Sequence, residues 1–183
     1  MKHANHIDRL EIRLAGEGGQ GMILAGIILA EAAAVYDNKT AVQTQSYGPE
    51  ARGGASKAEV IISNGEIDFP EIIAADVLVA MSQEACDKYS PGLKDDGLLI
   101  VDSEKVGRVT YPNNVRVPIT RNAKETTGRA ITANIYVLGL LTKITAAVSL
   151  PAIEKAVSAR APKGTQELNL AALKAGYSFE HLA

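Results

Sequence analysis

The sequence predicts an α/β fold, with a mainly parallel β-sheet, flanking helices and a helical C-terminal third. Three observations lead to this prediction. Short apolar segments typical of buried strands alternate with helical segments through the first two thirds of the chain. A cluster of glycines separates the first of these strands from the first helix, and beyond about residue 129 apolar residues recur only at helical spacing. The 183 residues suffice for one domain over 1–183, with residues 1–8 expected to be a flexible tail.

The first half of the chain alternates between strand and helix patterns. Leu10–Ala15 is an apolar run that stops at a glycine, which predicts the first strand. Apolar residues every three or four positions predict a helix over residues 20–36, and Asp-Asn at 37–38 marks a turn. Residues 40–46 and 56–63 are expected to be strands joined by a polar loop, the second of them antiparallel to the sheet.

Buried strands are expected in the middle of the chain. Asp76–Met81 is a short apolar run, typical of a central parallel strand buried on both faces. Ser82 suits the N-cap of a helix over Gln83–Tyr89. Leu98–Val101 and Val115–Val117 are further strand candidates, and a proline ends the last one.

The C-terminal third is predicted to be helical. The first helix has a stripe formed by Ile131, Ile135, Leu138 and Thr142. Pro151 suits the first turn of a second helix. A last, weaker helix is indicated by Leu168, Ala172, Ala175 and Leu182.

Charge and composition exclude several classes of function. The formal net charge is −2, which gives no electrostatic case for nucleic acid. No apolar run reaches the roughly 18–20 residues that a membrane span needs. The first nine residues are polar and lack the apolar core of a signal peptide, so a cytoplasmic protein is expected.

The glycine cluster is Gly-Glu-Gly-Gly-Gln-Gly at residues 16–21, and it satisfies the pattern G-x-G-x-x-G. A strand, a glycine loop and a helix in this order direct free backbone N–H groups toward an anion and indicate a Rossmann-like sheet. The candidate ligand-binding residues here are Gly16, Gly18, Gly19, Gln20 and Gly21.

A complete dinucleotide site is not supported, because such a site needs an acidic residue at the end of the second strand. That strand ends in Gln-Thr-Gln-Ser at residues 43–46, and Asp37 precedes it, at the other edge of the sheet. A P-loop is excluded because no Gly-Lys-Ser/Thr follows the glycines. Two interpretations remain. The glycines either form only a tight bend, or their amides face a phosphate or carboxylate, shared with another chain.

A second motif, Ser-Tyr-Gly-Pro-Glu-Ala-Arg-Gly-Gly, occupies residues 46–54 and follows the second predicted strand. In a parallel sheet it would lie at the same carboxyl edge as the glycine loop. Its candidate site residues are Tyr47, Glu50, Arg52 and Gly53, of which Arg52 is suited to a bidentate contact with an anion. The alternative is that Glu50 and Arg52 are solvated loop charges.

The residues suited to metal or redox chemistry are few. Cys86 is the single cysteine, so this chain cannot hold an iron–sulfur cluster with four thiolates of its own. Cys86 itself is expected to be a small buried filler rather than a redox thiol. His3 and His6 are spaced for one face of a helix, but in the N-terminal tail they are expected to be solvated.

The two motifs, in this order and spacing, resemble the gamma subunit of 2-oxoacid:ferredoxin oxidoreductases. The resemblance covers most of residues 9–150, and the wording of residues 45–50 is most similar to the 2-oxoglutarate branch. It implies a non-autonomous enzyme subunit in a complex that converts a 2-oxoacid and coenzyme A (CoA) to acyl-CoA, CO2 and reduced ferredoxin. The two motifs then face the CoA region or a partner, and no residue of this chain is expected to be catalytic.

The resemblance also implies the division of cofactors. Thiamine diphosphate with Mg2+, and the iron–sulfur clusters, are expected on alpha, beta and, where present, delta ferredoxin-like subunits, with no cofactor held by this chain alone. A homodimer in isolation is left open. The alternative function is a stand-alone nucleotide- or CoA-binding module without catalytic activity.

Overall fold

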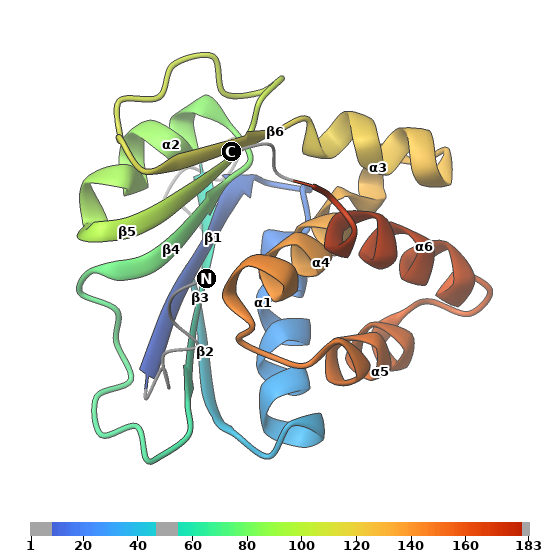
Figure 1. Ribbon diagram of the computed structural model, residues 1–183, viewed down its shortest axis with the longest axis horizontal. Coiled ribbons are helices and arrows are strands. Elements are labelled where there is room, and N and C mark those ends of the chain that lie inside the picture. The colour runs from blue at the N-terminus through green and yellow to red at the C-terminus, as the bar shows by residue number, and fades with distance from the viewer. Residues whose placement is uncertain (1–8, 47–54, 181–183) are drawn as a thin grey trace.

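A single mixed sheet forms the centre of the computed structural model, which describes residues 9–46 and 55–180 (Figure 1). The strand order is β2-β3-β1-β4-β5-β6. The strands are β1 (Arg9–Glu17), β2 (Thr40–Ser46), β3 (Ala55–Ser63), β4 (Ala75–Ala80), β5 (Leu93–Asp102) and β6 (Asn114–Val117). All six predicted strands are therefore present, most of them longer than the sequence pattern indicates.

The strand directions confirm the predicted mainly parallel sheet. β4 pairs parallel to β1 and to β5, and β5 pairs parallel to β6. β3 runs antiparallel to both of its neighbours, β1 and β2, as expected for residues 56–63. Because β3 separates them, β1 and β2 point the same way and end at the same edge.

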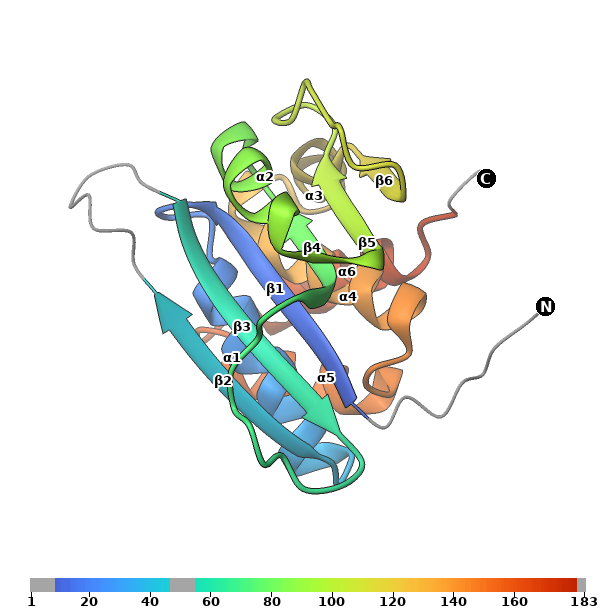
Figure 2. The same ribbon diagram turned by 90° about the vertical axis from the view of Figure 1, so that its left-hand side faces the viewer.

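Helices cover both faces of the sheet. They are α1 (Met22–Glu31), α2 (Gln83–Tyr89), α3 (Ile119–Thr127), α4 (Ala133–Thr145), α5 (Leu150–Arg160) and α6 (Gln166–Tyr177). A π-helical turn, Ala32–Tyr36, prolongs α1. Figures 1 and 2 show α1, α4, α5 and α6 on one side of the sheet and α2 on the other. The helical C-terminal third is thus confirmed.

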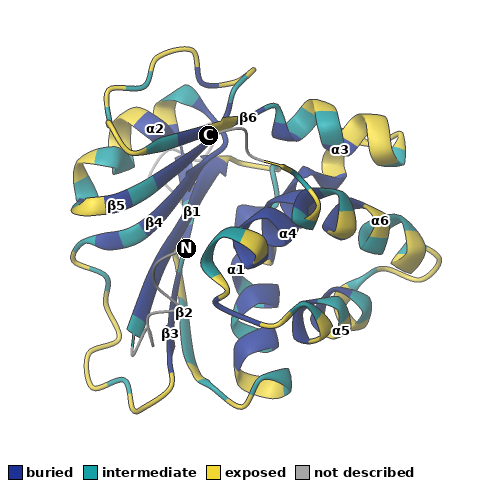
Figure 3. Cartoon of the chain, in the orientation of Figure 1, coloured by how far each residue is buried: buried dark blue, intermediate teal, exposed yellow. Residues whose placement is uncertain are grey.

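Five of the six residues of the central strand β4 are buried, which confirms that it is covered on both faces (Figure 3). Val77 and Val79 belong to the core cluster shared with α1 and the C-terminal helices. Leu78 and Ala80 belong to a second cluster, which includes Cys86 of α2. Ser82 caps α2 as expected, and its Oγ accepts a hydrogen bond from the Ala85 N–H at 3.2 Å.

The sequence pattern missed one helix, and one expectation about the helices was wrong. No helix was predicted for residues 119–127, where the structure has α3, a polar helix in which only Ile119 and Ala123 are buried. Ile131 does not join the buried stripe of α4, because a 3₁₀ turn over Ala130–Thr132 precedes that helix and leaves Ile131 65% exposed. Across the described ranges, none of the helices has the length and apolarity to cross a bilayer.

Candidate functional site

The glycine loop lies where the chain leaves the sheet toward opposite faces. β1 leads through this loop into α1, whereas the neighbouring strand β4 leads through Ser82 into α2 on the other face (Figure 1). The carboxyl ends of β1 and β4 therefore form a topological switch point, the place where open α/β sheets bind ligands. The loop at residues 16–21 lies at this edge.

Three of the loop glycines meet a local structural requirement. Gly19 and Gly21 have φ angles of 92° and 76°, which L-residues with side chains rarely adopt. A Cβ on Gly16 would collide with the side-chain oxygen of Gln20. Gly18, in contrast, has open space around it and no positive φ.

The Gln20 side chain spans the switch point. Its Oε1 accepts a hydrogen bond from the Glu17 N–H at 2.7 Å, and its Nε2 donates to the carbonyl of Met81 at 3.0 Å. The amide thus ties the end of β1 to the residue that follows β4. Both side-chain groups are thus engaged within the chain, and the role of Gln20 in ligand binding stays a prediction.

The glycine loop presents backbone N–H groups at the protein surface. Gly18 and Gly19 are exposed. Within the described residues, their N–H groups have no hydrogen-bond acceptor. At the start of α1, Gly21 occupies the N-cap position and provides no side chain to cap the first-turn amides. Free amides beside a helix N-terminus favour an anionic group.

The second motif residues, Tyr47, Glu50, Arg52 and Gly53, lie outside the described residues. The strand register nevertheless fixes the two ends of that segment. Ser46 at the end of β2 pairs with Lys57, and Ala55 at the start of β3 pairs with Glu17. The described residues on either side of this segment, Ser46 and Ala55, therefore lie at the same sheet edge as the glycine loop.

The charges beneath this edge are paired within the chain. Arg13 on β1 is 6% exposed and forms an ion pair with Glu59 of β3 at 2.7 Å. Lys57 contacts the same carboxylate at 3.0 Å, and both cations lie within 6 Å of the Tyr89 ring centroid. A buried charge is tolerated when it is paired in this way, so we assign this cluster to the fold rather than to ligand binding.

The position of Asp37 explains why the dinucleotide site is incomplete. It precedes β2, at the edge opposite the glycine loop. Its carboxylate accepts a hydrogen bond from the Ser149 hydroxyl at 2.6 Å and joins α1's extension to the start of α5. This acidic residue is therefore far from the position that would bind a ribose.

Cys86 is 2% exposed, as expected for a buried filler. Burial, with a smaller contribution from the neighbouring Asp87, raises the pKa of its thiol. In the part of the chain that the structure describes, no three His, Cys, Asp or Glu side chains are grouped to hold a metal ion. A four-thiolate cluster does not fit a chain with one cysteine.

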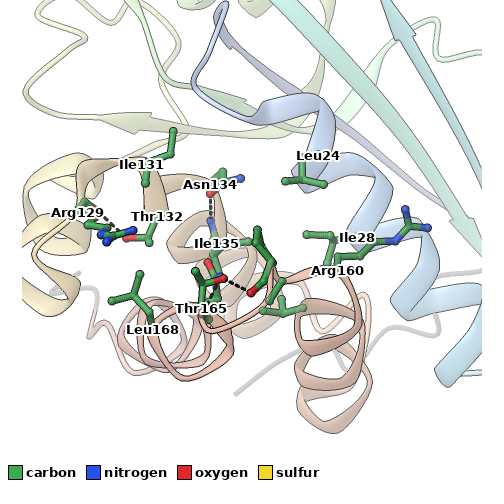
Figure 4. Close-up of a pocket in the computed structure, with 14 residues that line it drawn as sticks. Leu24, Ile28, Arg129, Ile131, Thr132, Asn134, Ile135, Arg160, Thr165 and Leu168 are labelled. Atoms are coloured by element: carbon green, nitrogen blue, oxygen red, sulfur yellow. Dashed lines mark hydrogen bonds between the residues drawn. The ribbon is translucent and has the colours of Figure 1, made fainter.

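A pocket of about 220 Å³ opens next to the glycine loop, between α1, α4, α5 and α6 (Figure 4). Asn134 connects the two features, because it lines the pocket and its Nδ2 donates to the Gly21 carbonyl at 3.4 Å. The sequence did not predict this pocket. Ile131 lines this pocket, but the sequence pattern assigned it to a buried helical stripe.

Comparison with known proteins agrees with the geometry. The family described as pyruvate ferredoxin/flavodoxin oxidoreductase matches residues 11–179. The 2-oxoglutarate synthase subunit KorC of Methanocaldococcus jannaschii is 54% identical over 173 residues, covering 92% of each chain. The crystal structure of a keto/oxoacid ferredoxin oxidoreductase gamma subunit from Geobacter sulfurreducens superposes with a TM-score of 0.84 at 51% identity, covering 92% of this chain and 94% of that one.

A larger enzyme shares the fold. The 2-oxoglutarate:ferredoxin oxidoreductase from Magnetococcus marinus, solved with 2-oxoglutarate, coenzyme A and succinyl-CoA bound, superposes with a TM-score of 0.83. The identity is 23%, and the match covers 93% of this chain and 31% of that one. The family model spans nearly the whole described sheet and its helices, and the match to the M. jannaschii subunit covers 92% of each chain. The chain therefore belongs to the pyruvate ferredoxin/flavodoxin oxidoreductase family.

Proposed function

We propose that this chain is the gamma-type subunit of a 2-oxoglutarate:ferredoxin oxidoreductase. The complex would oxidatively decarboxylate 2-oxoglutarate with CoA, giving succinyl-CoA, CO2 and reduced ferredoxin. The observation that carries the choice of substrate is the difference in identity. The M. jannaschii 2-oxoglutarate synthase subunit is 54% identical, whereas a pyruvate/ketoisovalerate gamma subunit of Pyrococcus furiosus is 34% identical.

The chain contributes structure rather than redox chemistry to this reaction. Its one thiol is buried, and four thiolates are needed for a cluster. As the family resemblance implies, thiamine diphosphate, Mg2+ and the iron–sulfur clusters would lie on alpha, beta and, where present, delta subunits, and the electrons would pass to ferredoxin in the cytoplasm. Carbanion chemistry is a property of thiamine diphosphate, so the activity requires the complex.

The edge at the switch point has a role in that complex. Gly18 and Gly19 offer exposed amides, and Gln20 holds them in place through Glu17 and Met81. Together with Tyr47, Glu50, Arg52 and Gly53, these amides would face an anionic group of CoA or of a neighbouring subunit. Arg52 is suited to the strongest such contact, because a guanidinium binds carboxylate and phosphate with two parallel hydrogen bonds.

The test is reconstitution. The chain is purified alone and together with its alpha, beta and delta partners, and CoA-dependent reduction of a viologen dye is measured with 2-oxoglutarate, pyruvate and ketoisovalerate. We expect no activity from the isolated chain and a preference of the complex for 2-oxoglutarate. Activity of the chain alone, failure to assemble, or a preference for pyruvate would contradict the proposal.

Calorimetry with CoA and NAD distinguishes the proposed subunit from the alternative, a stand-alone binding module. Tight binding of either to the isolated chain, without assembly, would favour a stand-alone binding module. In the complex, Arg52→Ala should raise the KM for CoA or weaken assembly while leaving the melting temperature of the isolated chain unchanged, since single loop charges add little to stability. A large loss of melting temperature would make Arg52 structural instead.

A further inference from the structure

The pocket between α1, α4, α5 and α6 has the features of a protein docking site. We propose that it receives an aliphatic side chain next to a carboxylate, carried by an acidic segment of a neighbouring subunit. This inference rests on the proposed function, because it names the surface through which the gamma-type subunit joins its complex. Three properties of the pocket carry it: its size, its exposed apolar rim and an arginine that has no ionic partner among the described residues.

The pocket is small and apolar. Its apolar lining includes Ile28 of α1, Ile135 of α4, Val157 of α5 and Leu168 of α6. Its volume of about 220 Å³ is below the roughly 300–1,000 Å³ of pockets that enclose drug-sized ligands and cofactors. A side chain therefore suits it better than a nucleotide cofactor does.

Two large apolar side chains stand at the rim of the pocket, at its upper side in Figure 4. Leu24 on α1 is 41% exposed, and Ile131 in the turn before α4 is 65% exposed. Exposed apolar groups that surround a concave site and are themselves bordered by polar residues are typical of interaction surfaces. A partner side chain seated in the pocket would cover both.

The charges at the pocket select the partner. Figure 4 shows Arg129 and Arg160 at opposite ends. Arg160 is neutralised, since its Nε lies 2.5 Å from a carboxylate oxygen of Glu31. Within the described residues, the Arg129 guanidinium has neither an ion pair nor a hydrogen-bond acceptor, and the pocket lining contains no acidic residue. A carboxylate on the partner is the complementary group.

The test measures assembly rather than chemistry. The chain and its variants are titrated onto immobilised alpha and beta subunits, and the dissociation constant is measured at several salt concentrations. Arg129→Glu and Ile131→Glu should each weaken binding at least tenfold. Arg129→Gln should reduce the salt dependence of binding. Matched controls outside the pocket are Ile73→Glu, at an 82% exposed isoleucine, and Lys88→Glu on α2.

The outcomes separate the two proposals. If the wild-type chain does not bind the other subunits, the proposed function fails. If it binds and the complex is active, but the pocket variants bind as tightly as wild type or lose no more than the controls, this inference fails alone. A raised KM for CoA with unchanged assembly would also overturn it, because the pocket would then serve the co-substrate. Unchanged melting temperatures verify that the variants are folded.

Discussion

Substituting Gly176 by alanine tests the tightest contact in the C-terminal helical layer. Helices α4 and α6 approach each other closely at Gly139 and Gly176. A Cβ on Gly176 would collide with the carbonyl oxygen of Tyr136 and would lie 2.9 Å from its carbonyl carbon and 3.1 Å from the Leu140 nitrogen. These are backbone atoms, which cannot rotate aside as a side chain can, so the helices must separate.

The magnitude follows from two opposing effects. Overpacking a well-filled core costs about 1–3 kcal/mol, and contact with backbone atoms places this site at the upper end of that range. Alanine is favoured over glycine inside a helix by about 1 kcal/mol, which offsets part of the cost. The free energy of unfolding should therefore fall by about 2 kcal/mol. For a domain of this size that corresponds to a melting temperature lower by about 4–8 °C.

Urea unfolding followed by circular dichroism measures the change. Gly107→Ala is the matched control, because a Cβ there meets no atom within 4 Å and the residue has no positive φ. The control should change the free energy of unfolding by less than about 0.5 kcal/mol. Adding Gly139→Ala to Gly176→Ala should cost less than the sum of the single changes, because the helices have already moved apart. A Gly176→Ala variant as stable as wild type would refute the reasoning.

Three further predictions concern the sheet edge and α2. Gly21→Ala should lower the free energy of unfolding by about 1–2 kcal/mol because of the positive φ, whereas Gly18→Ala should leave it within about 0.5 kcal/mol, as urea titration would show. Ser82→Ala removes the N-cap of α2 and should cost about 1 kcal/mol in the same assay. Burial raises the pKa of Cys86 above its ordinary 9.0, so the thiol stays neutral in the fold when the unfolded chain ionises. The difference in free energy of unfolding between wild type and Cys86→Ala should be constant below pH 9, and the stability of the wild type should decline relative to the variant above it. A pH-independent difference would contradict this.

The sheet could be predicted because its signals are local. Alternating or continuous apolar residues identify the strands, and in β4 both faces are buried, as the unbroken apolar run indicates. Helix α3 carries little such signal, since two of its nine residues are buried. Its boundaries do leave a trace, Pro118 before the helix and Gly128 after it, with a φ of 74° at Gly128. A glycine with positive φ commonly ends a helix, and proline is common near a helix start.

The candidate site could be predicted only in part, because it depends on contacts between residues that are far apart in the sequence. The glycine pattern located the bend. It could not predict the hydrogen bond from Gln20 to Met81, because only the fold brings these residues, 61 positions apart, together. The pocket is harder still to foresee. It is lined by residues from Leu24 of α1 to Leu168 of α6, and the pattern within one helix does not indicate which other helix lies beside it.

The glycine loop and the pocket adjoin each other, so variants must be chosen that change one without the other. Asn134 contacts the carbonyl of Gly21 and also lines the pocket, so its substitution would disturb the glycine loop and the docking surface together. Within the described residues, Arg129 and Ile131 line the pocket and form no hydrogen bond to the loop, and Gly18 lies on the loop without lining the pocket. Assembly that depends on Arg129 and Ile131, combined with CoA use that depends on the loop, would show that one side of α1 serves both the complex and its co-substrate.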